Sequence, residues 1–184
     1  MITHEELVEA FGEDNVVLLD AEKARSAGLS EMDMLILTHV GFPRYAGPLF
    51  TTDIVGQPAL FQVEEFPANG VINRVMFLGG PEDDDQARFF LDIPDGFIVF
   101  MALTDDGSEA EVINSTLSDF LEFVYRFGVR YQSPAPETIE EVRQETDELD
   151  ALLRDRDPHA FRQAQTWWSM AIDAIREQSE KKYA

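Results

Sequence analysis

Residues 89–100 of the chain have the sequence FFLDIPDGFIVF, and this stretch decides the fold class. Two apolar runs flank Pro94-Asp95-Gly96, where proline presets its own φ and glycine accepts the left-handed position of a reverse turn. Because both runs are short and rich in aromatic and β-branched residues, they predict two antiparallel strands joined as a hairpin. We expect the rest of the fold to be arranged around the sheet that contains this hairpin.

The strand period extends outward from the hairpin over about seventy residues. Gly79-Gly80-Pro81 and Asp105-Asp106-Gly107 are further chain breaks of the kind that separates strands. The strands predicted between these breaks are Leu49–Thr52, Leu60–Phe66, Asn73–Leu78, Ala87–Ile93, Phe97–Leu103 and Ala110–Ile113.

Helix signals precede the strands. Thr3 and Glu6 form a capping-box pattern that begins a helix ended by Gly12. Ser30 is placed to cap another helix, which would run to about His39 and stop before Gly41-Phe42-Pro43. Between them, Val16 to Leu19 fits a short buried strand, and Ala21 to Ala27 fits one or two helical turns.

More helix signals follow the strands. Thr116 caps an amphipathic helix that reaches Tyr131, and Ser133-Pro134-Ala135-Pro136 then breaks the chain. A second helix is predicted from Glu137 to about Arg154. Asp157 would cap the last helix and Pro158 would open it.

This order of elements predicts an α+β fold. We expect a largely antiparallel, or mixed, sheet of about five to six strands flanked by N-terminal and C-terminal helices. Residues 1–132 would form the core, and residues 133–184 would be a helical extension packed on that core as part of a single structural unit.

Charge is the strongest compositional signal. The 184 residues contain 36 Asp and Glu against 14 Lys and Arg, a formal net charge of −22 at pH 7. A field of this sign opposes direct binding to nucleic acid or to anionic lipid, and it attracts basic proteins. The alternative explanation is solubility, or a producer whose proteins are acidic in general.

Cysteine and targeting signals are missing from the sequence. No cysteine is present, so disulfide and thiolate chemistry are excluded. The first residues, MITHEELVEAFGEDN, lack the basic and apolar regions of a signal peptide. We therefore expect a cytoplasmic protein without a membrane partner.

Four sequence segments resemble the SUKH superfamily, and most closely its SUKH-4-like immunity branch. The segments are THVGFP at 38–43, FLGG at 77–80, FFLDIPDGFIVF at 89–100 and VINSTLSDFL at 112–121, and the likeness spans roughly residues 30–130. The resemblance implies an α+β sheet flanked by helices and a bacterial cytosolic antidote that neutralises a polymorphic toxin, often a nuclease or nucleic-acid deaminase. It implies no catalytic residues. The same letters are also folding signals, with Gly41 starting extended chain and Asn114-Ser115 leading into a helix.

Motifs for catalysis, cofactors or metals are not found. The sequence has no P-loop and no G-x-S-x-G elbow, and His4, His39 and His159 lie far apart. Residues 81–92, which include the three aspartates after Glu82, do not have the ligand spacing of an EF-hand loop. We predict no catalytic residue, no cofactor and no metal, although the many acids leave a carboxylate pair open by counting alone.

Two acidic groups and one tryptophan are the candidate partner-binding residues. The loop group could converge at one end of the sheet, and the helix group repeats acids at intervals of four, which costs a helix a few tenths of a kcal/mol per pair. The simpler interpretations are solvated loop tips, a solvated helix face and a core tryptophan. The residues are Glu82, Asp83, Asp84, Asp85, Asp105, Asp106, Glu109 and Glu111 in the loop group, Glu137, Glu141 and Glu145 in the helix group, and Trp167.

The leading hypothesis is therefore a non-enzymatic immunity protein that binds a basic cognate toxin domain through an acidic surface. It would be a monomer or a weak homodimer. One alternative is a SUKH-type regulatory scaffold without a toxin, and another is a small-substrate enzyme that uses acidic residues. A shallow acidic surface would favour the first, and a deep pocket with convergent acids would favour the enzyme.

Overall fold

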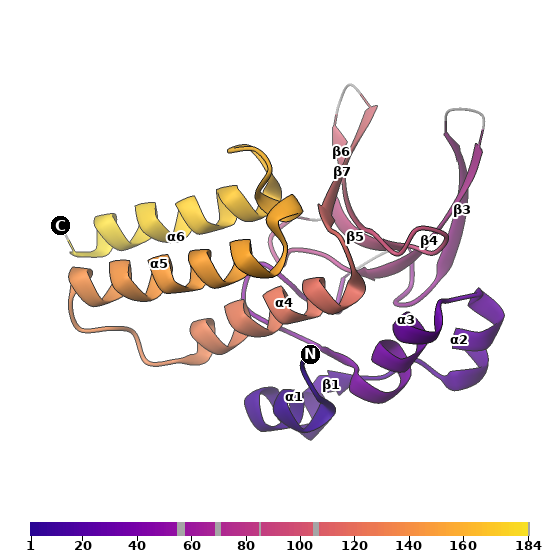
Figure 1. Cartoon of the computed structure of the whole chain (residues 1–184), viewed down its shortest axis with the longest axis horizontal. Helices are drawn as coiled ribbons and strands as arrows, with labels where there is room; N and C mark the ends of the chain where they lie inside the picture. Colours follow the sequence, from indigo (N-terminus) through magenta and orange to yellow (C-terminus); the bar gives the residue numbers. More distant parts are fainter. Residues whose placement is uncertain (55–57, 69–70, 85, 105–106, 184) are drawn as a thin grey trace.

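A five-stranded sheet with helices at both ends of its sequence organises the molecule (Figure 1). The computed structural model describes residues 1–54, 58–68, 71–84, 86–104 and 107–183. In the view of Figure 1 the helices α4, α5 and α6 lie to one side of the sheet, and α1, α2 and α3 lie below it.

All neighbouring strands of this sheet run antiparallel, in the sequential order β3-β4-β5-β6-β7. The predicted α+β class with an antiparallel sheet is confirmed. The predicted strand Leu49–Thr52 is wrong, because Thr51 makes only isolated bridges, to Tyr45 and Gly80. The strands are β3 (Val63–Ala68), β4 (Val71–Gly79), β5 (Ala87–Asp92), β6 (Ile98–Thr104) and β7 (Gly107–Asn114).

The hairpin between β5 and β6 has the predicted turn. Gly96 adopts φ of +75°, and its backbone N–H donates to Asp92 O at 2.8 Å. The Asp92 carboxylate also accepts from the backbone N–H of Asp95. Because the turn is closed by local hydrogen bonds, the apolar runs on either side pair in register, with Phe89 opposite Phe100.

The N-terminal part consists of short helices and a two-stranded ribbon. The capping box of Thr3 and Glu6 and the cap at Ser30 are confirmed, but the helix after Ser30 changes to a π-helix before it ends. Gly41 then has φ of +90°, and a Cβ there would lie 2.8 Å from Val17 O. The elements are α1 (His4–Phe11), a 3₁₀ turn (Glu13–Asn15), β1 (Val16–Val17), α2 (Ala21–Ala27), α3 (Glu31–Leu35), the π-helix (Ile36–Val40) and β2 (Phe42–Pro43), which pairs with β1.

Three long helices follow the sheet: α4 (Leu117–Gln132), α5 (Ile139–Arg156) and α6 (Trp167–Tyr183). Thr116 caps α4 as predicted. The cap of α5 is Thr138, so that helix begins two residues later than predicted. The prediction that Asp157 and Pro158 begin the last helix is wrong, because Pro158–Phe161 form only a 3₁₀ turn and α6 begins at Trp167.

Aromatic side chains fill the space between the sheet and the helices. The rings of Phe50 and Phe89, from the loop before β3 and from β5, contact the ring of Phe120 on α4 at 5.7 and 5.4 Å between centroids. Trp168 of α6 stacks on Phe127 at 5.2 Å. Burial of such large side chains contributes about 2–3 kcal/mol each, so this cluster fixes how α4 and α6 sit on the sheet.

Candidate functional site

The acidic loop, which we define as Glu82, Asp83 and Asp84, connects β4 to β5. The backbone N–H of Glu82 donates to Pro48 O at 2.9 Å, and its carboxylate accepts from the Tyr45 hydroxyl at 2.8 Å. Asp84 accepts from the backbone N–H of Gln86 at 2.9 Å and so closes the turn. All three acids are exposed, and Asp85 lies outside the described residues.

Tyr45 ties this loop to the end of α4. Its ring meets that of Tyr131 edge to face at 6.0 Å. Loss of solvation, followed by the contacts with Tyr131 and Glu82, raises the pKa of the Tyr45 hydroxyl above its usual value. Tyr45 therefore remains a protonated donor to Glu82 at neutral pH, and the acidic loop is held by a bond that does not titrate there.

Of the remaining loop acids, Glu109 and Glu111 lie on β7 of the β6–β7 hairpin. Register places Ala87 opposite Ala102 and Ala102 opposite Glu109, so the β4–β5 connection leaves the sheet at the same end as this hairpin. Glu109 is exposed. Asp105 and Asp106 lie outside the described residues.

Glu111 is half-buried and has intramolecular partners. Its carboxylate accepts from the backbone N–H of Trp167 at 3.3 Å and lies 3.5 Å from the Arg162 guanidinium. Burial raises the pKa of Glu111, while the Trp167 amide and Arg162 oppose the rise. A carboxylate at the N-terminus of α6 stabilises that helix through its dipole, so Glu111 has a structural task.

Two acids of the helix group, Glu141 and Glu145, lie on α5 and have partners, whereas Glu137 precedes the helix, which begins at Ile139. The Glu141 carboxylate accepts from the backbone N–H groups of Glu137 and Thr138, at 2.9 and 3.1 Å. Glu145 accepts from the Arg130 guanidinium at 3.1 Å. Intramolecular contacts thus already relieve part of the repulsion along α5, and Glu137 keeps an exposed side chain. Figure 1 shows α5 beside α6, on the side of the molecule away from β3.

Trp167 packs against the sheet with its ring half-buried. It stacks on Phe100 with 4.5 Å between ring centroids and meets Phe89 edge to face at 5.6 Å. Among the described residues its buried indole N–H has no hydrogen-bond partner. The arrangement agrees with the core interpretation of this residue, because its ring stacks on the sheet and its indole nitrogen is buried.

An unexpected polar clamp joins the end of β7 to the C-terminal helices. The buried carboxylate of Asp157 accepts from Asn114 Nδ2 at 3.1 Å and from the backbone N–H and hydroxyl of Ser115, both at 2.8 Å. Asn114 Oδ1 in turn accepts from the indole N–H of Trp168 at 2.8 Å. We call Asn114, Ser115, Asp157 and Trp168 the junction clamp.

No separate sequence signal marks the junction clamp. Asp157 followed by Pro158 has the pattern of a helix cap, and Asn114-Ser115 has that of a strand end. Instead, the Asp157 carboxylate accepts hydrogen bonds from Asn114 and Ser115, which lie more than forty residues earlier in the chain. The clamp therefore positions the C-terminal helices on the sheet.

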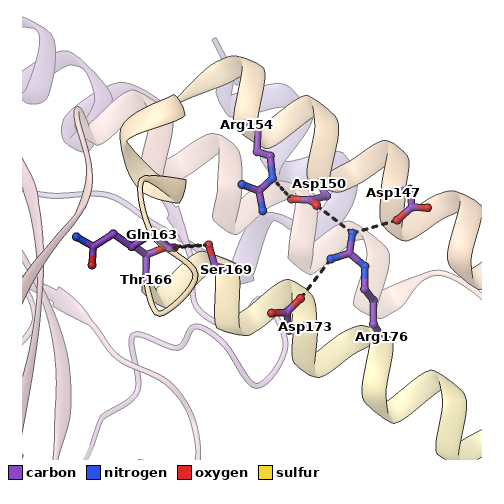
Figure 2. A network of polar contacts seen from close by, with 8 residues as sticks. All are labelled: Asp147, Asp150, Arg154, Gln163, Thr166, Ser169, Asp173 and Arg176. Carbon is purple, nitrogen blue, oxygen red and sulfur yellow. Dashed lines mark hydrogen bonds and ion pairs between the residues drawn. The ribbon is translucent and has the colours of Figure 1, made fainter.

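Figure 2 shows a second polar network, which joins α5 to α6. One guanidinium nitrogen of Arg176 lies 3.0 Å from Asp147 and 2.9 Å from Asp150, and the other lies 3.3 Å from Asp173. Arg154 also pairs with Asp150, at 2.7 Å. Burial alone would lower the pKa of Arg176, but its hydrogen bonds to Asp150 and Asp147 raise it, so the bridge stays charged.

The start of α6, also drawn in Figure 2, is closed by hydroxyl groups. Thr166 and Ser169 both donate to the carbonyl oxygen of Gln163 at 3.0 Å. These bonds, with the Glu111 carboxylate, explain why α6 begins at Trp167 and not at Pro158.

A polar hollow of about 330 Å³ between α1, α4 and α5 is the place where an acid-based enzyme site could be sought. Its buried acid, Glu122, is neutralised by Arg126, whose Nε donates to it at 2.9 Å. Hydrogen bonds from Thr3 lower the pKa of Glu6. A general acid needs a raised pKa, which is the opposite of the shift at Glu6.

Two searches of the described residues add negative findings. In the part of the chain that the structure describes, no group of three or more His, Asp or Glu could hold a metal ion. Within the same residues, no helix has the length and apolar character needed to cross a membrane.

The sheet topology and the junction clamp define an α+β protein with helices before and after an antiparallel sheet. The family model of the SUKH-4 immunity protein matches residues 2–174. The chain therefore belongs to the SUKH-4 immunity protein family, and the match extends beyond residues 30–130 to include Asp157 and Trp168. A search among curated proteins finds no match. A search among solved structures finds none either.

Proposed function

We propose that this protein is a cytosolic immunity protein that binds a cognate toxin domain and blocks its active site. The observation that carries the proposal is membership of the SUKH-4 immunity protein family over residues 2–174. The net charge of −22 supports it, because a strongly acidic protein attracts a basic partner and speeds their encounter.

The toxin that fits this charge acts on nucleic acid. A nuclease or a nucleic-acid deaminase must attract polyanionic substrate, so its active face is basic. An acidic inhibitor can occupy that face in place of the phosphates. The proposed mode of action is therefore occlusion by binding, with no chemical step on the side of the inhibitor.

We assign part of the contact surface to the acidic loop. Glu82 is anchored by Tyr45 and by Pro48 O, so the loop is held in position before the partner arrives. Asp83 and Glu109 have exposed side chains, and among the described residues neither carboxylate has a polar partner to give up on binding. Glu111, Glu141 and Glu145 are engaged within the protein, so they contribute charge more than direct contacts.

The test is whether a toxin domain is encoded beside the gene for this chain and whether this chain protects cells against that domain. Co-expression of the two proteins should restore growth, and the purified proteins should form an equimolar complex that titrates out the toxin activity. A regulatory scaffold would bind a cellular protein and give no rescue. An enzyme acting on a small substrate would protect at far less than one copy per toxin.

Restored growth without any complex between the purified proteins would refute inhibition by occlusion. A catalytically inactive toxin domain should be used for the binding measurement, so that toxicity does not limit the amount of protein.

A further inference from the structure

An apolar groove runs between α4, α6 and the loop before β3. Its volume is about 220 Å³. The α6 side carries Ala171, Ala174, Ile175 and Gln178, at the spacing of one helix face. The other walls are Ala46, Pro48 and Leu49 from the loop and Phe127, Arg130 and Tyr131 from α4.

This groove lies where the apolar stripe of α6 reaches the surface, because Ala171 belongs to the core and Ile175 packs against it, and both line the groove. Trp168 and Ile172 point into the core and are almost completely buried, while Ala174, on the groove side, is exposed. Met170 lies one turn before Ala174 and is 49% exposed. Ala174 and Met170 thus extend the apolar surface of α6 beyond the core stripe, and apolar surface that the fold leaves uncovered indicates a place where another molecule packs.

Tyr131 forms a fixed ridge beside the groove. It is 58% exposed, yet its ring packs so closely over Gly47 that a Cβ on that glycine would lie 2.9 Å from the ring. A neighbouring hollow lies on the other side of Tyr131, near Pro134 and Tyr183. Rigid exposed tyrosines are frequent anchors at protein interfaces because little conformational entropy is lost when they are covered.

Negative charge borders the groove at its loop end. Pro48, which lines the groove, accepts the hydrogen bond from the backbone N–H of Glu82, so the acidic loop lies directly beside it. Arg130, the one cation that the described residues contribute to the groove wall, already donates to Glu145 at 3.1 Å and to the Thr146 hydroxyl at 2.9 Å. A segment in the groove would thus place its basic residues toward Glu82.

We propose that this groove is the anchoring site for an amphipathic helical segment of the basic partner, with apolar side chains in the groove and Lys or Arg against the acidic loop. The inference rests on the proposed function for the identity of the partner. Helices that bind in grooves use apolar anchors at helical spacing, which suits a groove lined by α4 and α6.

Other occupants fit the groove less well. A volume of 220 Å³ is below the roughly 300–1,000 Å³ of typical small-molecule sites and suits one or two anchor side chains. A second copy of the chain would bring a further net charge of −22 and be repelled. An anionic lipid surface is opposed by the same charge.

The test uses a peptide built only from Leu and Lys, four helical turns long, with the leucines on one face. A control peptide has the same composition with the leucines spread around the helix. At physiological salt the amphipathic peptide should bind the full chain at least about tenfold more tightly than the control peptide. Ala174→Trp, which fills the groove, should weaken binding about tenfold.

The matched control variant is Ala151→Trp, another exposed alanine on a helix, here α5. It should bind as the wild type does. Tyr131→Ala provides a second groove variant, and circular dichroism confirms that all variants are folded. Equal binding of both peptides, or equal binding by Ala174→Trp and Ala151→Trp, would overturn the inference.

The groove and the proposed function fail in different measurements. If the chain rescues cells from the toxin but the peptide ignores Ala174→Trp, only the groove is wrong. If the peptide binds the groove but no rescue or complex is found, the immunity proposal fails and the groove belongs to a different basic partner.

Discussion

Replacing Asp157 by alanine should loosen the C-terminal helices from the sheet. The Asp157 side chain is only 3% exposed and accepts three hydrogen bonds, from Asn114 Nδ2 and from the backbone N–H and hydroxyl of Ser115. In Asp157→Ala the Ser115 hydroxyl can turn elsewhere, but the buried donors of Asn114 and Ser115 lose their acceptor. Each donor left without an acceptor costs about 1–3 kcal/mol of the free energy of unfolding.

The net loss should be about 3 kcal/mol of the free energy of unfolding, because the variant also removes the cost of burying a carboxylate. Asp157→Asn is the matched control. Its amide oxygen can keep the two N–H donors, and its amide nitrogen can donate to the Ser115 hydroxyl, so a loss of about 1 kcal/mol is expected.

Urea unfolding followed by tryptophan fluorescence measures both variants, since Trp168 is part of the junction clamp and is 1% exposed. A loss below about 0.5 kcal/mol for Asp157→Ala would refute the reasoning. So would equal losses for Asp157→Ala and Asp157→Asn.

The division of the chain at residue 132 stays a prediction, and we propose on the basis of this clamp that residues 133–184 complete a single structural unit.

Four further outcomes are expected. Arg176→Gln should cost about 1 kcal/mol by urea unfolding, and less at high salt, because the guanidinium is 37% exposed and its ion pairs are partly screened. Gly41→Ala should cost about 1–3 kcal/mol in the same assay, since φ is +90° and the new Cβ would lie 2.8 Å from Val17 O; unchanged stability would contradict this geometry. Burial raises the pKa of Asp33 above 3.8, although the hydrogen bond from Ser30 opposes the rise, so the folded state binds this proton more tightly than the unfolded state does. The wild type should therefore lose stability relative to Asp33→Asn as the pH rises from below 3.8 through the folded pKa. A stability difference that does not change with pH would be inconsistent with this shift. Changing Asp83–Asp85 to Lys should slow association with the toxin and flatten its salt dependence, whereas the same charge change at Glu9, Glu13 and Asp14 should have a smaller effect; an unchanged on-rate in the first variant would exclude the acidic loop.

Local patterns predicted those parts of the fold that local hydrogen bonds hold together. The cap at Thr116, the capping box at Thr3 and the left-handed glycine in the β5–β6 turn are each closed within four residues, so their letters suffice to find them. The predicted strand at Leu49–Thr52 is wrong because its apolar pattern does not come from pairing in a sheet. Phe50 packs in the core, and Thr51 makes only isolated bridges.

The candidate site could be predicted only in part. Composition identified an acidic protein and the loop group, but it could not distinguish acids that serve the fold from acids that face solvent. Glu111 accepts a hydrogen bond from Trp167 and Glu145 accepts one from Arg130, and both partners are far away in the sequence. The groove beside Tyr131 has walls from three separate segments, and no single segment shows its pattern.

The sequence by itself determined the α+β class, several helix caps, the turn between β5 and β6, the sign of the charge and the family, because each of these depends on residue identity, on the order of local patterns or on neighbours within one turn. Only the tertiary structure decided that the Asp157 side chain binds Asn114 and Ser115 and does not cap a helix. Its local pattern favours a helix cap, worth about 1 kcal/mol. The three hydrogen bonds that Asp157 accepts from Asn114 and Ser115, one buried and two part-buried, are together worth more, and they exist only after the chain has folded β7 against the C-terminal helices.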